Sequence, residues 1–401
     1  MARLVRLAAP AFRNDFAHHA EGVARLNHGS FGATPAPVLA RERELRDTWL
    51  AHPDAEYFSG ALNDDLAEAA EAAGAAIGAP ANTCALVDNA SVAAAIVLKR
   101  WSKARAPSTL LLSCCYGGVR RAAEVTVGAE HIVDAKVAFP NTSHERVLAD
   151  LDAALKRSRP KFALLDHITS QPAIALPVGE MVALCRDRGV EEVAVDGAHA
   201  CGQVPVDVGA VGADFYWTNL HKWSFAGPVA TAMHARDEAS LTHVIPSWNA
   251  GLGLLAEARW TGTRDYTSLR AVPAALAYAA TWRSAEDLDA PTFNALGLRQ
   301  AAAQLRDAWG TATAYEEKDC FSSMGMVRLP DMDMSLDAPG KPATAASVRS
   351  RLRADYGVEA AVGGFPEDGA LRGFLRLSHA VYTTDDDVAR LKSAVLDLAG
   401  K

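Results

Sequence analysis

Residues 191–223 read EEVAVDGAHACGQVPVDVGAVGADFYWTNLHKW, and two features of this stretch decide the fold. The apolar run 193–195 leads directly into Asp196, so we expect Asp196 at the carboxyl end of a buried strand, where open α/β sheets bind ligands. A second strand-like run, 213–220, ends just before Lys222. Neighbouring strands are therefore predicted to bring a carboxylate and an amine to the same edge of a sheet.

Strand-like runs alternate with helical stretches around this segment. Short apolar runs at 109–113, 161–168 and 229–235 are typical of buried strands, and the amphipathic stretch 177–189 is typical of a helix between them. Such alternation requires crossover connections and predicts a mainly parallel sheet covered by helices on both faces. The sequence thus predicts an α/β domain over about residues 84–260.

The two ends of the chain have different patterns. Residues 36–52 and 61–79 carry apolar residues at helical spacing. Near the C-terminus, strand-like runs at 325–330 and 373–380 flank a Pro/Ala-rich loop, and residues 383–400 begin like a capped helix with an acidic first turn. We expect three parts: an N-terminal segment that contributes to the active site and the small domain (1–60), a large α/β domain (61–265) and a smaller α+β domain (266–401).

Composition excludes several classes of function. The chain of 401 residues carries a net charge of −8 and no basic stripe, so we expect no nucleic-acid partner. No apolar run is long enough to span a bilayer, and we expect no membrane partner. The six cysteines lack metal-ligand spacing, which predicts free thiols and no metal site. The short arginine-containing start soon reaches an acidic residue, and we expect a cytoplasmic protein.

Lys222 lies in a stretch without other lysine, arginine or acidic residues, 216–227. A lysine in apolar surroundings is costly unless it is paired, neutral or covalently used; a surface lysine with its ammonium in water is the alternative. The carboxylate of Asp196 at the same edge favours a reactive amine. Pyridoxal 5′-phosphate (PLP) enzymes need this pair, because the lysine forms a Schiff base and the carboxylate keeps the pyridine nitrogen protonated.

The phosphate of such a cofactor needs hydrogen-bond donors. Asn89, Ala90 and Ser91 stand at the start of an amphipathic helical stretch, where free backbone N–H groups bind dianions. Asn219 and His221 come just before Lys222 and add side-chain donors. A plain helix cap is the alternative interpretation of Asn89–Ser91, but together with the lysine and the carboxylate it predicts a phosphate site.

Four segments carry a resemblance to a known family: VDGAHA (195–200), TNLHKW (218–223), LNHGSFGATPAPV (26–38) and WTGTRDYTSL (260–269). The chain resembles the class V aminotransferase family of PLP enzymes from about residue 24 to its end. Within the family it is similar to the branch of isopenicillin N epimerase and the sulfoxide C–S lyases of ergothioneine biosynthesis. The resemblance implies the α/β fold of PLP-dependent transferases of the aspartate aminotransferase type, with a mainly parallel seven-stranded sheet. It also implies PLP as cofactor, a small amino-acid substrate and a homodimer with shared active sites.

The resemblance further implies a role for each matching residue. Lys222 would form the Schiff base, Asp196 would pair with the pyridine nitrogen, and His199 would lie near the phenolic oxygen of the ring. Tyr116 would stack on the ring and take part in catalysis. The phosphate would be bound by Ala90, Ser91, Asn219 and His221, and by Thr263 from the neighbouring subunit. The substrate would be bound by Arg376, which suits its α-carboxylate, and by His28 and Ser30, with His28 also catalytic. His167, by contrast, is expected to be a satisfied buried histidine.

PLP lowers the cost of removing the α-proton, and the protein selects the fate of the resulting carbanion. Cysteine desulfuration would need a thiol on the loop ahead of Arg376, and residues 357–373 contain no cysteine. Epimerisation needs a second acid, which Tyr116 or a histidine could supply. Transamination needs only Lys222, and β-elimination needs a leaving group on the substrate.

The LNHGSFG segment, with its His28, favours the C–S lyase. We therefore expect cleavage of the Cβ–S bond of a cysteine-derived sulfoxide, similar to hercynylcysteine sulfoxide, giving pyruvate and ammonia. Epimerisation and transamination are the enzymatic alternatives. A catalytically inactive small-molecule binding protein is the alternative outside enzymes, and the presence of both Lys222 and Asp196 argues against it.

Overall fold

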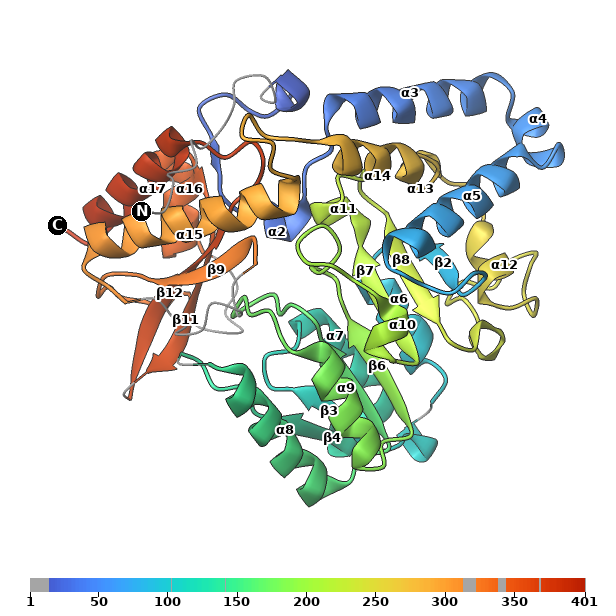
Figure 1. Cartoon of the computed structure of the whole chain (residues 1–401), viewed down its shortest axis with the longest axis horizontal. Helices are drawn as coiled ribbons and strands as arrows, with labels where there is room; N and C mark the ends of the chain where they lie inside the picture. Colours follow the sequence, from blue (N-terminus) through green and yellow to red (C-terminus); the bar gives the residue numbers. More distant parts are fainter. Residues whose placement is uncertain are drawn as a thin grey trace.

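The computed structural model describes residues 14–101, 103–140, 142–312, 322–337, 344–367 and 369–400. A seven-stranded sheet forms its centre, in the order β2-β8-β7-β6-β5-β3-β4 (Figure 1). Only β8 runs antiparallel to its neighbours in this sheet, so the predicted mainly parallel seven-stranded sheet is confirmed. The strands are β2 (Cys84–Val87), β3 (Thr109–Leu112), β4 (Ile132–Ala135), β5 (Phe162–Asp166), β6 (Glu192–Asp196), β7 (Phe215–Asn219) and β8 (Thr231–Ala235).

Helices cover both faces of this sheet. In Figure 1, α8 and α9 lie side by side in front of the strands, and α6 lies behind them. Strands β3, β5 and β7 are buried along their whole length, which explains their apolar sequences. The helical segments here are α5 (Ala61–Ala76), α6 (Ala90–Leu98), η2 (Lys103–Arg105), α7 (Gly117–Ala123), η3 (Glu124–Gly128), η4 (Ala129–His131), α8 (His144–Ser158), α9 (Val178–Asp187), α10 (Val208–Val211), α11 (Leu220–Trp223), η5 (Glu238–Ser240) and α12 (Leu254–Arg259).

The C-terminal part builds a separate small sheet with its own apolar core. Its three antiparallel strands have the order β11-β12-β9, and a short parallel pair, β1 with β10, lies beside α16 and α17. The predicted capped helix near the C-terminus is confirmed, since Thr384 and Asp387 form a reciprocal capping box. The elements are β9 (Met324–Arg328), β10 (Val358–Glu359), β11 (Ala361–Glu367), β12 (Ala370–Ser378), α15 (Ala290–Trp309), α16 (Val348–Tyr356) and α17 (Asp385–Leu398).

The N-terminal segment and the helices after the large sheet join the two parts. Residues Ala24 and Leu26 belong to the small core, whereas Leu269 and Val272 belong to the large one. We therefore propose that the domain boundary lies near residue 282, after α14, rather than at 265. The elements are η1 (Asn14–Phe16), β1 (Ala24–Arg25), α2 (His28–Phe31), α3 (Ala36–Ala51), α4 (Pro53–Phe58), α13 (Thr267–Arg270) and α14 (Val272–Thr281). None of the described helices is long and apolar enough to cross a membrane.

Candidate active site

The carboxyl ends of β5, β6 and β7 open into a cavity of about 420 Å³ that α2 and β12 close from the side of the small sheet. This volume falls in the range of small-molecule sites, about 300–1,000 Å³. Ten of the twelve predicted site residues line this one cavity, although they come from six separate parts of the chain. They are Ser30, Ala90, Ser91, Tyr116, Asp196, His199, Asn219, His221, Lys222 and Arg376.

Lys222 sits on the short helix α11, directly after β7. Its Nζ lies 3.1 Å from Nε2 of His199. Burial lowers the pKa of Lys222 to about 7, which the negative charge of Asp196 opposes and the positive charge of Arg376 reinforces. The amine is therefore largely neutral in mildly alkaline solution, as a nucleophile or a base must be.

Asp196 is the last residue of β6 and is buried. Its Oδ1 accepts a hydrogen bond from the Ala198 N–H at 2.9 Å. Burial raises the pKa of this carboxyl, while the Ala198 N–H and the charge of Lys222 act in the opposite direction. A cationic ring nitrogen at this position would compensate the buried charge, so Asp196 suits the pyridine nitrogen of PLP.

The amino end of α6 also lines the cavity. Asn89 caps the helix by accepting a hydrogen bond from the Val92 N–H at 3.0 Å. The side-chain oxygen of Asn219 accepts the Ala90 N–H at 3.0 Å. The Ala90 N–H is thus already used, and we propose that Ser91 and His221, which also line the cavity, are the donors for a phosphate.

Arg376 is a buried residue of β12, and its guanidinium reaches into the cavity. It donates to Ser170 Oγ at 3.1 Å and to the Ser170 carbonyl at 3.0 Å. It also donates to Asn27 Oδ1 at 2.7 Å and to Ser30 Oγ at 2.6 Å. These contacts fix the planar fork that a substrate carboxylate would meet.

His28 does not line the cavity, contrary to the sequence-based prediction. Its ring is 2% exposed and lies between Tyr382 and the backbone of Lys222. Nδ1 is 2.9 Å from the Tyr382 hydroxyl, and Nε2 is 2.6 Å from the Lys222 carbonyl oxygen. The ring of His28 points toward α11 and Tyr382, and we propose that His28 supports α11 and does not bind the substrate.

Thr263 and Tyr116 lie at the margins. Thr263 lines a separate surface hollow of about 230 Å³ with Trp49 and Leu50, so it does not face Lys222 of its own chain. Tyr116 stands at the rim, 51% exposed, with its ring over Gly118, where an added Cβ would come within 2.8 Å of the ring. The absence of a side chain at Gly118 therefore leaves room for the ring, while the stacking role of Tyr116 stays a prediction.

Several residues in and around the cavity were not predicted from the sequence. Asp166, the last residue of β5, is buried and lies in register with Asp196. Ser170 and Asn27 hold Arg376. His167, predicted to be a satisfied buried histidine, is half-buried and hydrogen-bonds the Tyr216 hydroxyl at 2.8 Å, so the predicted hydrogen-bond partner is confirmed. A signal for Asp166 existed in the sequence, because the apolar run 162–165 leads into Asp166 as the run 193–195 leads into Asp196.

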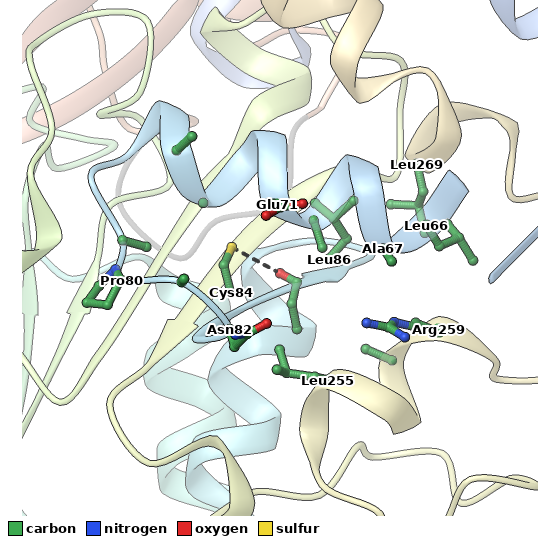
Figure 2. A pocket seen from close by; sticks show the side chains of 17 residues that line it. Leu66, Ala67, Glu71, Pro80, Asn82, Cys84, Leu86, Leu255, Arg259 and Leu269 are labelled. Carbon is green, nitrogen blue, oxygen red and sulfur yellow. Dashed lines mark hydrogen bonds between the residues drawn. The ribbon is translucent and has the colours of Figure 1, made fainter. Parts of the chain in front are cut away.

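A second hollow is also large enough for a small molecule. It has about 320 Å³ and lies between α5, β2 and α12, and none of the predicted residues lines it. Figure 2 shows Cys84 in its wall and the charged groups of Glu71 and Arg259 apart from each other. Burial raises the pKa of Cys84 to about 12, so this thiol is unreactive near neutral pH.

The fold and the cavity, with an amine of lowered pKa, a buried carboxylate and a helix amino end, define an enzyme that uses PLP. The family model for class V aminotransferases matches residues 33–257, and the chain belongs to that family. An L-cysteine desulfhydrase of Arabidopsis thaliana is 33% identical over 413 residues, which cover 96% of this chain and 90% of the relative. A putative L-cysteine desulfhydrase of Oryza sativa subsp. japonica is 34% identical over 97% of this chain and 86% of the relative.

The narrower resemblance is confirmed as well. The isopenicillin N epimerase of Streptomyces clavuligerus is 26% identical over 94% of this chain and 96% of the relative. The hercynylcysteine sulfoxide lyase of Schizosaccharomyces pombe is 22% identical over 52% of this chain and 53% of the relative. Among solved structures, a cystine C–S lyase complexed with cysteine persulfide has the same fold, with a TM-score of 0.73 over 94% and 98% of the two chains at 16% identity.

Proposed function

We propose that this enzyme is a C–S β-lyase that acts on cysteine or a cysteine derivative and releases pyruvate, ammonia and the sulfur leaving group. The main observation behind the proposal is that Lys222 and Arg376 line the same cavity. The pKa of the Lys222 amine is lowered to about 7, and the Arg376 guanidinium can bind a substrate carboxylate. The similarity to L-cysteine desulfhydrases over nearly the whole chain supports it. Because the sulfoxide lyase is similar over only about half of the chain, we favour a thiol over a sulfoxide as the leaving group.

The residues of the cavity divide the work of the reaction. Arg376 would hold the α-carboxylate of the substrate in the cavity that Lys222 also lines. Lys222 takes the α-proton as general base, and His199 keeps the amine in place through their hydrogen bond. PLP, when bound, accepts the electron pair left at the α-carbon. Asp196 supplies the negative charge that keeps such a ring protonated.

The absence of a thiol on the loop before Arg376 separates this enzyme from desulfurases. Residues 357–373 contain no cysteine. Cys115 lies near the cavity, but burial raises the pKa of its thiol to about 12. Sulfur is therefore released from the substrate instead of being taken up by the protein.

A substrate panel tests the proposed function. L-Cysteine, a cysteine sulfoxide and an S-alkylcysteine are incubated with the PLP-loaded enzyme, and pyruvate and the released sulfur compound are measured. We expect both products in equal amounts, and a loss of about 10²–10⁴-fold in Lys222→Ala, the range for a general base. Lys161→Ala is the matched control, because Lys161 pairs with Glu191 on the surface. Inversion at the α-carbon without pyruvate would replace the lyase with an epimerase.

We also propose that the enzyme is a cytoplasmic homodimer in which Thr263 of one copy binds the PLP phosphate of the other. The position of Thr263 outside its own active-site cavity supports this. Mixed dimers of Lys222→Ala and Thr263→Ala chains test it, because one of their two sites carries neither change. Recovery of activity on mixing supports the shared site. If activity is not recovered and sedimentation shows that the protein is a monomer, the shared site is excluded. Cell fractionation tests the location.

A further inference from the structure

A second concave surface adjoins the active-site cavity. This surface, which we call the arginine groove, has a volume of about 370 Å³. Phe31 and Arg349 line both spaces, so the groove lies directly beside the cavity.

The arginine groove is basic. Arg25 comes from β1, and Arg349 and Arg353 come from α16, where a spacing of four residues puts both on one helix face. Glu359 is the one acidic side chain in the lining, and it is 3.6 Å from Arg25. Within the described part of the chain, Arg349 and Arg353 make no ion pair. The Asp337 carboxylate accepts hydrogen bonds from the backbone N–H groups of Val348 and Arg349, and these bonds anchor the start of α16.

This local charge opposes that of the whole molecule. The chain carries −8 overall, yet the groove places three guanidinium groups around one acidic side chain. A concave surface of one sign attracts ligands of the opposite sign and raises their local concentration. Guanidinium groups suit carboxylates in particular.

The groove is also linked to the substrate clamp. Asn27 lines the groove and accepts a hydrogen bond from Arg376 at 2.7 Å. A substrate whose α-carboxylate lies on Arg376 therefore has the groove beside it, on the side of Phe31.

We propose that the arginine groove binds the far end of the substrate, and that this substrate is an S-conjugate of cysteine whose substituent ends in a carboxylate. The proposal rests on the C–S lyase function given above. In the reaction the Cβ–S bond breaks, the sulfur leaves with the electron pair and takes a proton, and water supplies the oxygen of pyruvate as ammonia is released. Arg376 takes the α-carboxylate, and Arg349 and Arg353 take the distal one.

A matched pair of substrates tests this inference. S-(carboxypropyl)-L-cysteine and the corresponding amide, S-(carbamoylpropyl)-L-cysteine, differ by one charge. We expect kcat/KM to be about tenfold higher for the acid, mainly through KM, because charged hydrogen bonds to guanidinium groups are the stronger ones. The double variant Arg349→Gln, Arg353→Gln loses the preference, and added salt weakens it in the wild type. The double variant Arg349→Lys, Arg353→Lys keeps part of the preference for the acid.

Arg351 provides the control, because it lies on the same helix but pairs with Asp355 at 3.4 Å and does not line the groove. Arg351→Gln keeps the preference. Equal use of acid and amide by the wild type, or a preference that survives the double variant, overturns the inference. Calorimetric binding of both compounds to PLP-loaded Lys222→Ala separates this from failure of the lyase function, because binding is measured without turnover.

Discussion

The Nζ of Lys222 and the Nε2 of His199 lie 3.1 Å apart in one buried crevice. Burial lowers the pKa of Lys222 to about 7 and holds the pKa of His199 well below its usual value. In mildly alkaline solution both groups are thus neutral, and the amine can donate a hydrogen bond to the ring nitrogen. This pairing fixes the direction of the amine lone pair, which is what the chemistry needs.

The rate at which the apoprotein binds PLP will report this pKa. Only the neutral amine attacks the aldehyde, so the rate rises with pH and levels off above about 7, whereas an ordinary lysine would continue to about 10. Stopped-flow absorbance measures the rate. Lys161→Ala leaves the profile unchanged, and a rate that still increases above pH 9 would contradict the account.

Asp166 will behave as a neutral acid. Residues in register on parallel strands point to the same face, so the carboxyls of Asp166 and Asp196 are neighbours. Burial and the charge of Asp196 raise the pKa of Asp166 well above its usual range, while Arg120 opposes this. Asp166→Asn keeps the affinity for PLP within about threefold of the wild type, because asparagine is neutral like the protonated Asp166. Asp196→Asn lowers the affinity for PLP at least about tenfold, because it removes a negative charge.

Infrared difference spectra check the protonation state directly. The wild type minus Asp166→Asn difference should contain the carbonyl band of a protonated carboxylic acid at neutral pH. A carboxylate band in its place would show that Asp166 is ionised and that the assignment is wrong.

His28 will matter for stability and not for substrate binding. His28→Phe leaves the buried Tyr382 hydroxyl without its partner and costs about 1–3 kcal/mol. Burial lowers the pKa of His28 to about 3 from 6.5, so its contribution is present above pH 6.5 and is lost as the pH falls toward 3. Thermal unfolding at several pH values measures this. A KM raised more than about tenfold with unchanged stability would restore the substrate role.

The contrast between Lys222 and His28 shows what the sequence could predict. Lys222 and Asp196 follow buried strands, and the ends of parallel strands meet at one edge, so their positions follow from the pattern alone. His28 depends on how α2 packs on α11. At Gly32, with φ at +71°, an added Cβ would lie 1.8 Å from the His221 carbonyl oxygen, and this close approach turns His28 inward. No local pattern encodes such a contact between distant segments.

The support around Arg376 will appear in KM. Asn27→Ala removes one acceptor of the guanidinium and the acceptor of the Ser30 hydroxyl at 2.8 Å. We expect KM to rise several-fold with little change in kcat, and Arg376→Lys to lower kcat/KM by about 10- to 100-fold. Steady-state kinetics with L-cysteine measures both. An Arg376→Lys enzyme of wild-type efficiency would exclude the clamp.

The absorbance spectrum of the purified protein tests the central claim, that Lys222 anchors PLP in this cavity. We expect a visible band of PLP covalently bound to the protein in the wild type and in Lys161→Ala, and the loss of this band in Lys222→Ala even when PLP is added. A Lys222→Ala protein that keeps the wild-type band would contradict it, as would a wild type that gains no band with added PLP.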